Sequence, residues 1–93
     1  MFVGIVRIEL HIPGASSLKG KRSVVRSLKE RIRSRVHAAV AEVDHQDLWQ
    51  RAALGVAVVS GESRQVSEMI QSIRDLVNGT PEAEVLDWQE QIQ

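Results

Sequence analysis

The chain of 93 residues contains no cysteine and no tyrosine, and its aromatic side chains are limited to one phenylalanine and two tryptophans. Without cysteine, disulfides, Cys-ligated zinc and thiol nucleophiles are excluded. The scarcity of aromatics argues against a sheet that stacks RNA bases on exposed rings. Long apolar runs are also missing, since FVGIV at the N-terminus is interrupted by Arg7 and Glu9. Such a run is too short for a signal peptide or a membrane span, so we expect a cytoplasmic location and no membrane contact.

The length predicts a single domain over residues 1–93 and leaves little room for a deep, enclosed substrate cavity. Hydrophobic residues at 43% and charged residues at 26% are ordinary for a soluble globular protein. We therefore expect binding on an open face of the domain.

The charge is unevenly distributed although its formal net value is zero. Residues 19–35 contain eight basic residues against the single acid Glu30, a local charge of +7, and the remainder carries four basic and eleven acidic residues, or −7. This separation indicates an oriented surface with a partner on one side.

Hydrophobic periodicity predicts six elements. A strand over residues 2–13 alternates between two faces, and a helix capped by Ser16 or Ser17 follows to about Val36. Gly20 weakens its first turn, so a start after Gly20 is the alternative. Alternation returns from about His37, and the apolar run of residues 53–60 is typical of a central strand buried on both faces or nearly so. A second helix opens near Ser63 and stops at Asn78-Gly79, before a short last strand that includes Val85, Leu86 and Trp88.

The order strand, helix, strand, strand, helix, strand predicts an α+β fold, the ferredoxin-like βαββαβ plait. In that plait a four-stranded antiparallel sheet carries both helices on one face, and its first and third strands are central. The other sheet face is left open to water or to a partner.

The segment EVDHQDLWQRA, residues 42–52, concentrates polar and aromatic side chains around the expected turn. A metal site of Asp44, His45 and Asp47 requires a sharp bend, because adjacent residues of an extended strand point to opposite faces. A hydrolytic triad lacks the glycine pattern of a nucleophile elbow around any serine. We therefore predict a structural strand-turn-strand with Trp49 and Arg51 as contact residues, and no catalytic residue, metal or cofactor.

The first predicted helix carries five cations in one narrow arc at spacings of 3, 4, 3 and 4. We name this set the basic ridge: Lys19, Arg22, Arg26, Lys29 and Arg33. One interpretation is a solvated face that pairs with the acidic second half of the chain. The other is a nucleic-acid or ribosomal surface, extended by Arg51 and by Arg7 and His11 on the open sheet face.

Three stretches, RIELHIP, SLKGKRSVVRSLKERIRSR and AEVDHQDLWQRAALGVAVVS, closely resemble the DUF503 or YlxP-like family of small bacterial proteins. Gly20 stands where the family pattern has Glu. The resemblance implies a ferredoxin-like fold, offers no reaction or catalytic residue, and suggests by gene association a role near translation and ribosome maturation.

Two functional hypotheses follow from the sequence. The first is a non-enzymatic RNA- or ribosome-associated accessory protein that docks through the basic ridge. The second is a protein-interaction or homodimerisation module that uses the open sheet face, with Leu48 and Trp49 as anchors. An enzyme or metal protein that uses His11, His45, Asp44 and Asp47 is the least favoured.

Overall fold

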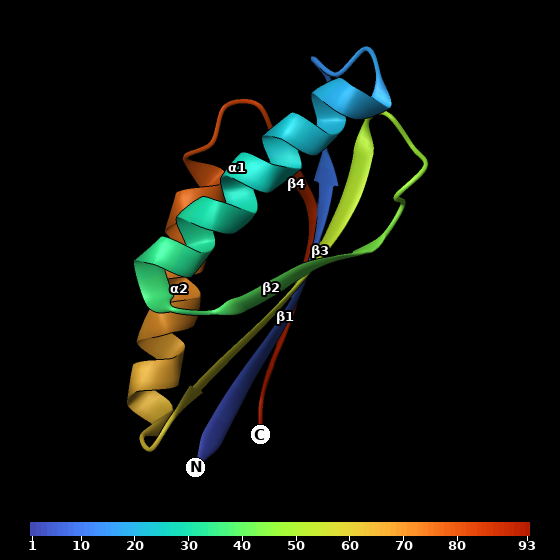
Figure 1. The fold of residues 1–93 in the computed structure, drawn as a ribbon. Coiled ribbons are helices and arrows are strands. Elements are labelled where there is room, and N and C mark those ends of the chain that lie inside the picture. Colours follow the sequence, from blue (N-terminus) through green and yellow to red (C-terminus); the bar gives the residue numbers. More distant parts are fainter.

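All six predicted elements are present in the predicted order. The computed structural model describes residues 1–93. The elements are β1 (Phe2–His11), α1 (Leu18–Val36), β2 (Ala39–Asp44), β3 (Arg51–Ser60), α2 (Ser63–Asn78) and β4 (Glu84–Ile92) (Figure 1). Neither helix combines the length and the apolar character that crossing a lipid bilayer requires.

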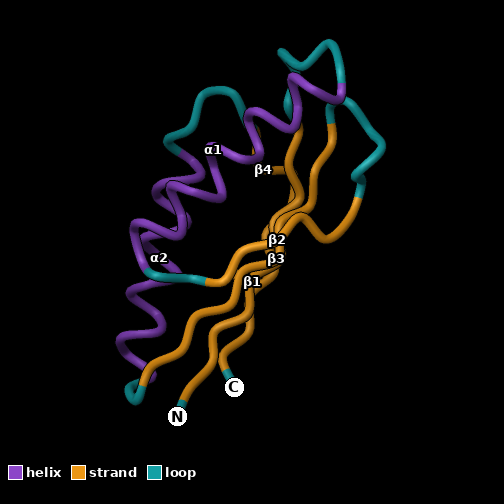
Figure 2. Tube along the Cα trace, in the orientation of Figure 1, coloured by secondary structure: helices purple, strands orange, loops and turns teal.

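The four strands form one antiparallel sheet in the order β2-β3-β1-β4, with both helices packed on one face (Figures 1 and 2). The central strands β1 and β3 pair along their whole length, from Phe2 opposite Ser60 to His11 opposite Arg51. The ferredoxin-like plait predicted from the sequence is therefore confirmed.

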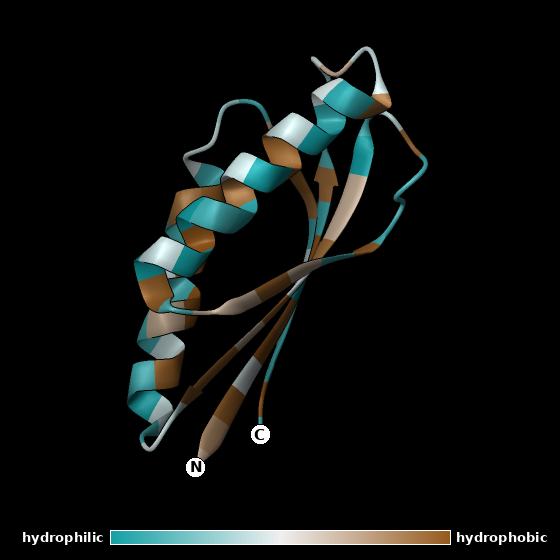
Figure 3. Cartoon of the chain, viewed as in Figure 1, coloured by the Kyte–Doolittle hydropathy of each residue, from teal (hydrophilic) through white to brown (hydrophobic).

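The core lies between the sheet and the two helices, because alternate strand residues and one stripe of each helix meet there. In Figure 3, brown and teal bands alternate along both helices, as this arrangement requires. Gly4 of β1 lets α2 approach closely, since a Cβ at this position would lie only 2.7 Å from Val66 Cγ1. Burying each large apolar side chain contributes roughly 1.5–3 kcal/mol. The largest buried apolar residues include Ile8, Leu10, Ile12, Leu28, Ile32, Leu54 and Ile73.

Three local expectations are corrected. Strand β3 is not buried on both faces along its whole length, because no helix covers the open face and Val59 remains 58% exposed there. Helix α1 starts at Leu18 in spite of Gly20, since the Gly20 N–H donates to Ser17 Oγ at 3.0 Å and completes the cap. Strand β4 spans nine residues, longer than the short strand predicted, because pairing with β1 extends its polar C-terminal part.

Candidate functional site

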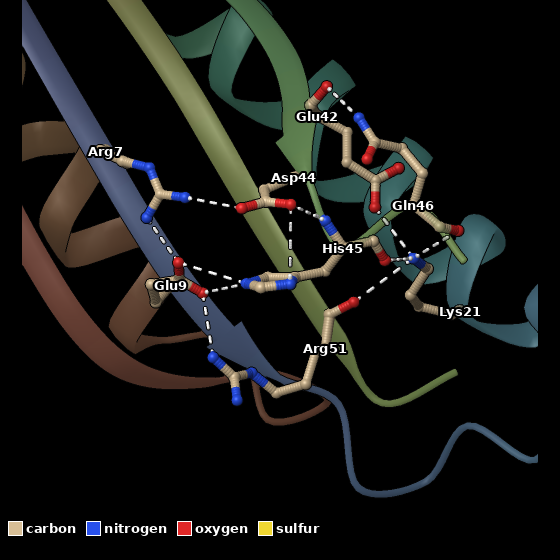
Figure 4. Close-up of polar contacts among 8 residues, drawn as sticks. All are labelled: Arg7, Glu9, Lys21, Glu42, Asp44, His45, Gln46 and Arg51. Atoms are coloured by element: carbon tan, nitrogen blue, oxygen red, sulfur yellow. Dashed lines mark hydrogen bonds and ion pairs between the residues drawn. The ribbon is translucent and has the colours of Figure 1, made fainter. Parts of the chain in front are cut away.

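Lys21, in the first turn of α1, is fully buried with 0% of its surface exposed, and points into the connection between β2 and β3 (Figure 4). Its Nζ lies 2.9 Å from Glu42 Oε2 and 2.9 Å from the carbonyl oxygen of His45. The carbonyl oxygens of Gln46 and Arg51 follow at 3.2 and 3.3 Å. A buried ammonium is tolerated only with such partners, so the segment of residues 42–52 wraps around one lysine.

His45 adopts a left-handed backbone conformation, with φ of 63°, which costs a non-glycine residue about 1–2 kcal/mol. This corner directs its carbonyl oxygen to Lys21 on one side of the sheet and its ring to Glu9 on the other (Figure 4). The backbone N–H of His45 donates to Asp44 Oδ1 at 2.8 Å, which stabilises the turn. The chain therefore makes the sharp bend that brings Asp44 and His45 together.

Glu9 is the centre of a second polar cluster, on the open face of the sheet. Its carboxylate accepts hydrogen bonds from the guanidinium groups of Arg7 and Arg51, the latter at 3.1 Å, and His45 Nε2 lies 3.1 Å away. Arg7 also reaches Asp44 Oδ2 at 3.4 Å. The hydrogen bond from Arg7, aided by Arg51 and His45, holds the pKa of Glu9 below its ordinary value of 4.5, although burial opposes this shift. Both guanidinium groups are thus paired, and the cluster acts as a cross-strand brace.

We predict that the Glu9 cluster makes stability depend on pH in the acidic range. Because the folded-state pKa of Glu9 lies below the unfolded value, its stabilisation is complete above about pH 4.5 and is lost as the pH falls through the folded value. Urea denaturation of the native chain and of Glu9→Gln, measured from pH 6 to pH 3, is expected to show a steeper decline for the native chain. Parallel curves for the two proteins would contradict this role of Glu9.

The catalytic and metal hypotheses find little geometric support. Asp44 Oδ1 and His45 Nδ1 lie 3.8 Å apart, but no group of three or more His, Cys, Asp or Glu side chains is placed to hold a metal ion. The Ser17 hydroxyl is occupied as the N-cap of α1. The contacts of Lys21 and of Glu9 fix the turn between β2 and β3 on both sides of the sheet.

The basic ridge lies on the flank of α1 that faces the edge strand β2. Arg33 Nη2 donates to the carbonyl oxygen of Val40 at 2.8 Å and marks this side. Arg31 lies outside the ridge arc and donates to Thr80 Oγ1 at 3.2 Å, on the flank toward α2. Four of the five ridge residues are exposed and Lys29 is half-buried. The structure therefore presents the ridge as one continuous line of cations.

No ridge side chain forms an ion pair within the protein. The acidic second half pairs elsewhere, with Arg64 bonded to Glu68 at 3.1 Å and Arg74 to Glu90 at 2.7 Å. The ion pairs between the ridge and the acidic second half that the solvated-face interpretation expected are therefore not formed.

The remaining residues predicted from the sequence lie outside helix α1. Leu48 and Trp49 are in the connection between β2 and β3, and Trp49 is 56% exposed. His11 Nδ1 lies 3.3 Å from Glu84 Oε2. Arg7, His11 and Arg51 lie on the open sheet face, opposite the helices.

Sequence reasoning missed Lys21, which it counted only as one cation among eight. The sequence did contain a sign of its burial, because position 21 lies on the apolar face of the helix, between Leu18 and Val25. A charged residue at a stripe position is a candidate for a buried, fully paired side chain.

The strand order and the single uncovered sheet face define a small ferredoxin-like α+β protein. The family model described as "Protein of unknown function (DUF503)" matches residues 3–90, and the chain belongs to this family. It is similar to the "Uncharacterized protein YlxP" of Bacillus subtilis (strain 168), with 32% identity over 82 residues that cover 88% of this chain and 89% of the relative. The resemblance seen in the sequence is confirmed.

Two solved structures share the fold at low sequence identity. A structural-genomics protein, YJCS, matches with a TM-score of 0.54 and 11% identity over 96% of each chain. A de novo designed protein with ferredoxin fold, LFR1 1, also has a TM-score of 0.54, with 13% identity over 100% of this chain and 86% of the design. At these identities the similarity shows the fold alone.

Proposed function

We propose that this protein is a non-enzymatic, cytoplasmic accessory protein that docks on RNA, in particular on the ribosomal RNA of a ribosomal subunit. The docking surface is the basic ridge of α1, which contacts the phosphate backbone. The observation that carries the proposal is the absence of any ion pair at the ridge, in a protein with as many acidic as basic residues.

An unpaired row of cations is unfavourable for the isolated protein. Like charges three or four residues apart destabilise a helix by about 0.2–0.5 kcal/mol per pair, and Glu30 is the only acidic residue in α1. An anionic partner removes this repulsion. The ridge extends over about 21 Å of helix, from Lys19 to Arg33, which suits a linear array of phosphates better than one small anion.

The surroundings of the ridge favour backbone contact over base reading. Trp88 packs against the core and under the Arg74 guanidinium, 4.6 Å from the ring centroid, so it offers no free face to a base on this side. Contacts from the ridge to phosphates depend on backbone charge and carry little sequence preference.

Arg7, His11 and Arg51 are left out of the proposed RNA surface. They lie on the sheet face opposite the helices. Arg7 and Arg51 already donate hydrogen bonds to Glu9, and His11 lies against Glu84. One RNA backbone that follows α1 does not reach that face.

The salt dependence of RNA binding tests the proposal. If four or five ridge cations each neutralise one phosphate, log Kobs plotted against log salt concentration falls with a slope of about −3 to −3.5 on single-stranded RNA. The measurement is a fluorescence-anisotropy titration of a labelled ribosomal RNA fragment at several salt concentrations, together with co-sedimentation on ribosomal subunits. A slope near zero, or no co-sedimentation at low salt, would remove the proposal.

A further inference from the structure

The open sheet face is divided into two chemically distinct halves. Its polar half surrounds Glu9, next to the turn between β2 and β3. Its other half, over β2, β3 and the start of β1, has no ionic group and is apolar, with Ile5 40%, Val43 48% and Val59 58% exposed. We name this half the open-face patch: Ile5, Ala39, Ala41, Val43, Ala57 and Val59.

The open-face patch has raised and hollow parts side by side. A shallow, mainly apolar hollow of about 480 Å³ is lined by Ala41, Gly55 and Ala57, with Ile5 and Val43 beside them and Arg7 at its polar end. Val43 leans over Gly55, since a Cβ on Gly55 would lie 2.8 Å from Val43 Cγ1. Branched side chains therefore stand next to positions where only a hydrogen or a methyl group occupies the surface.

We propose that a second copy of this chain covers the open-face patch and forms a homodimer of two sheets packed face to face. The two-fold axis runs parallel to the strands, midway between β1 and β3. Because Ile5 and Ala57 are direct cross-strand partners, this axis places Ile5 of one protomer over Ala57 of the partner subunit, and the reverse. Each large side chain then faces a small one.

The dimensions of the face fit a second copy. The ten-residue strands β1 and β3 span about 33 Å, and the four strands together cover about 20 Å, so the whole open face, with its polar half included, offers at most on the order of 600–700 Å². Stable interfaces bury about 600–1,000 Å² per partner. Two copies of one sheet also share the same twist, which is the condition for aligned packing of sheets about 10 Å apart.

The charges are also compatible with a second copy. On the β4 side, Gln89 and Gln91 pair with Arg7 and Ile5, so the rim beside the open-face patch is polar but uncharged. The same axis superposes β4 of one protomer on β2 of the partner, which places these glutamines against Ala39 and Ala41 of the partner subunit. Arg7 is the ionic side chain that this axis brings closest to the open-face patch: it lies over Gly55 of the partner subunit and stays paired with Glu9 of its own chain.

The proposed dimer is independent of the RNA-docking proposal. Both helices lie on the other side of the sheet, so the two basic ridges face outward in the dimer (Figure 1). Loss of the dimer therefore leaves a single ridge able to contact RNA.

Sedimentation equilibrium over a wide range of protein concentration tests the proposal. We expect a monomer–dimer equilibrium for the native chain, weakened roughly tenfold or more by Ile5→Lys or by Ala57→Glu, because each variant buries an unpaired charge. Mixing the two variants is expected to restore association, since the new lysine then faces the new glutamate at one contact and the other contact is native. Both positions are exposed, so the variants are expected to keep the native circular dichroism spectrum.

Leu48→Lys and Trp49→Ala are the matched controls, because they alter exposed apolar residues outside the open-face patch. We expect association to be unchanged in both. A native chain that stays monomeric at every concentration overturns the proposal. So does a dimer that is lost in the controls but kept in Ile5→Lys, since the hairpin would then be the contact.

Discussion

Replacing Lys21 with methionine is expected to lower the free energy of unfolding by about 3–5 kcal/mol, the usual cost of removing one partner from a buried ion pair. Methionine fits the length of the lysine side chain but donates no hydrogen bond. Glu42 Oε2 and the carbonyl oxygens of His45, Gln46 and Arg51 would all lose their shared donor. The left-handed corner at His45 would also lose the contact that helps to hold it in place.

Lys19→Met is the matched control for Lys21→Met. The two lysines lie in the same helical turn, but Lys19 is exposed and has no ion pair, so its replacement should change stability by no more than about 0.5 kcal/mol. Urea denaturation followed by circular dichroism measures both variants. Equal stability of the two variants would show that the segment of residues 42–52 is not anchored by Lys21. A loss of RNA binding in Lys21→Met without a loss of stability would instead assign this lysine a direct contact.

Reversing three ridge charges, Arg22→Glu, Arg26→Glu and Lys29→Glu in one chain, is expected to weaken RNA binding at low salt by roughly 100-fold or more. Three of the five proposed phosphate contacts disappear, and three carboxylates repel the backbone in their place. The residual salt slope should fall toward zero. None of these side chains forms an ion pair in the fold, so little stability should be lost.

The control for this variant carries the same change in net charge at other exposed positions: Arg31→Glu, Arg35→Glu and Arg64→Glu. These arginines lie outside the ridge, on the other flank of α1 and on α2. We expect their RNA affinity to stay within about threefold of the native value. Equal weakening in both triple variants would mean that overall charge governs binding, and no weakening in either would make the ridge an ordinary solvated face.

The sequence by itself determined the order and type of the elements and the fold class. Burial on one side of an element repeats every two residues in a strand and at three- and four-residue intervals in a helix, so β1, α1 and α2 could be predicted from spacing alone. The family could also be recognised, because AEVDHQDLWQRAALGVAVVS is a local pattern. The basic ridge belongs here too, since its residues share one face of one helix.

Only the tertiary structure decided what the polar residues of that segment do. Glu9 meets His45 and Arg51 from 36 and 42 positions away, and Lys21 reaches acceptors 21 to 30 positions later. Such contacts depend on strand register and on the left-handed corner at His45, neither of which hydrophobic periodicity specifies. The exposure of Val59 and Ala57 likewise follows from which face of the sheet the helices leave uncovered, and this is a property of the assembled layers.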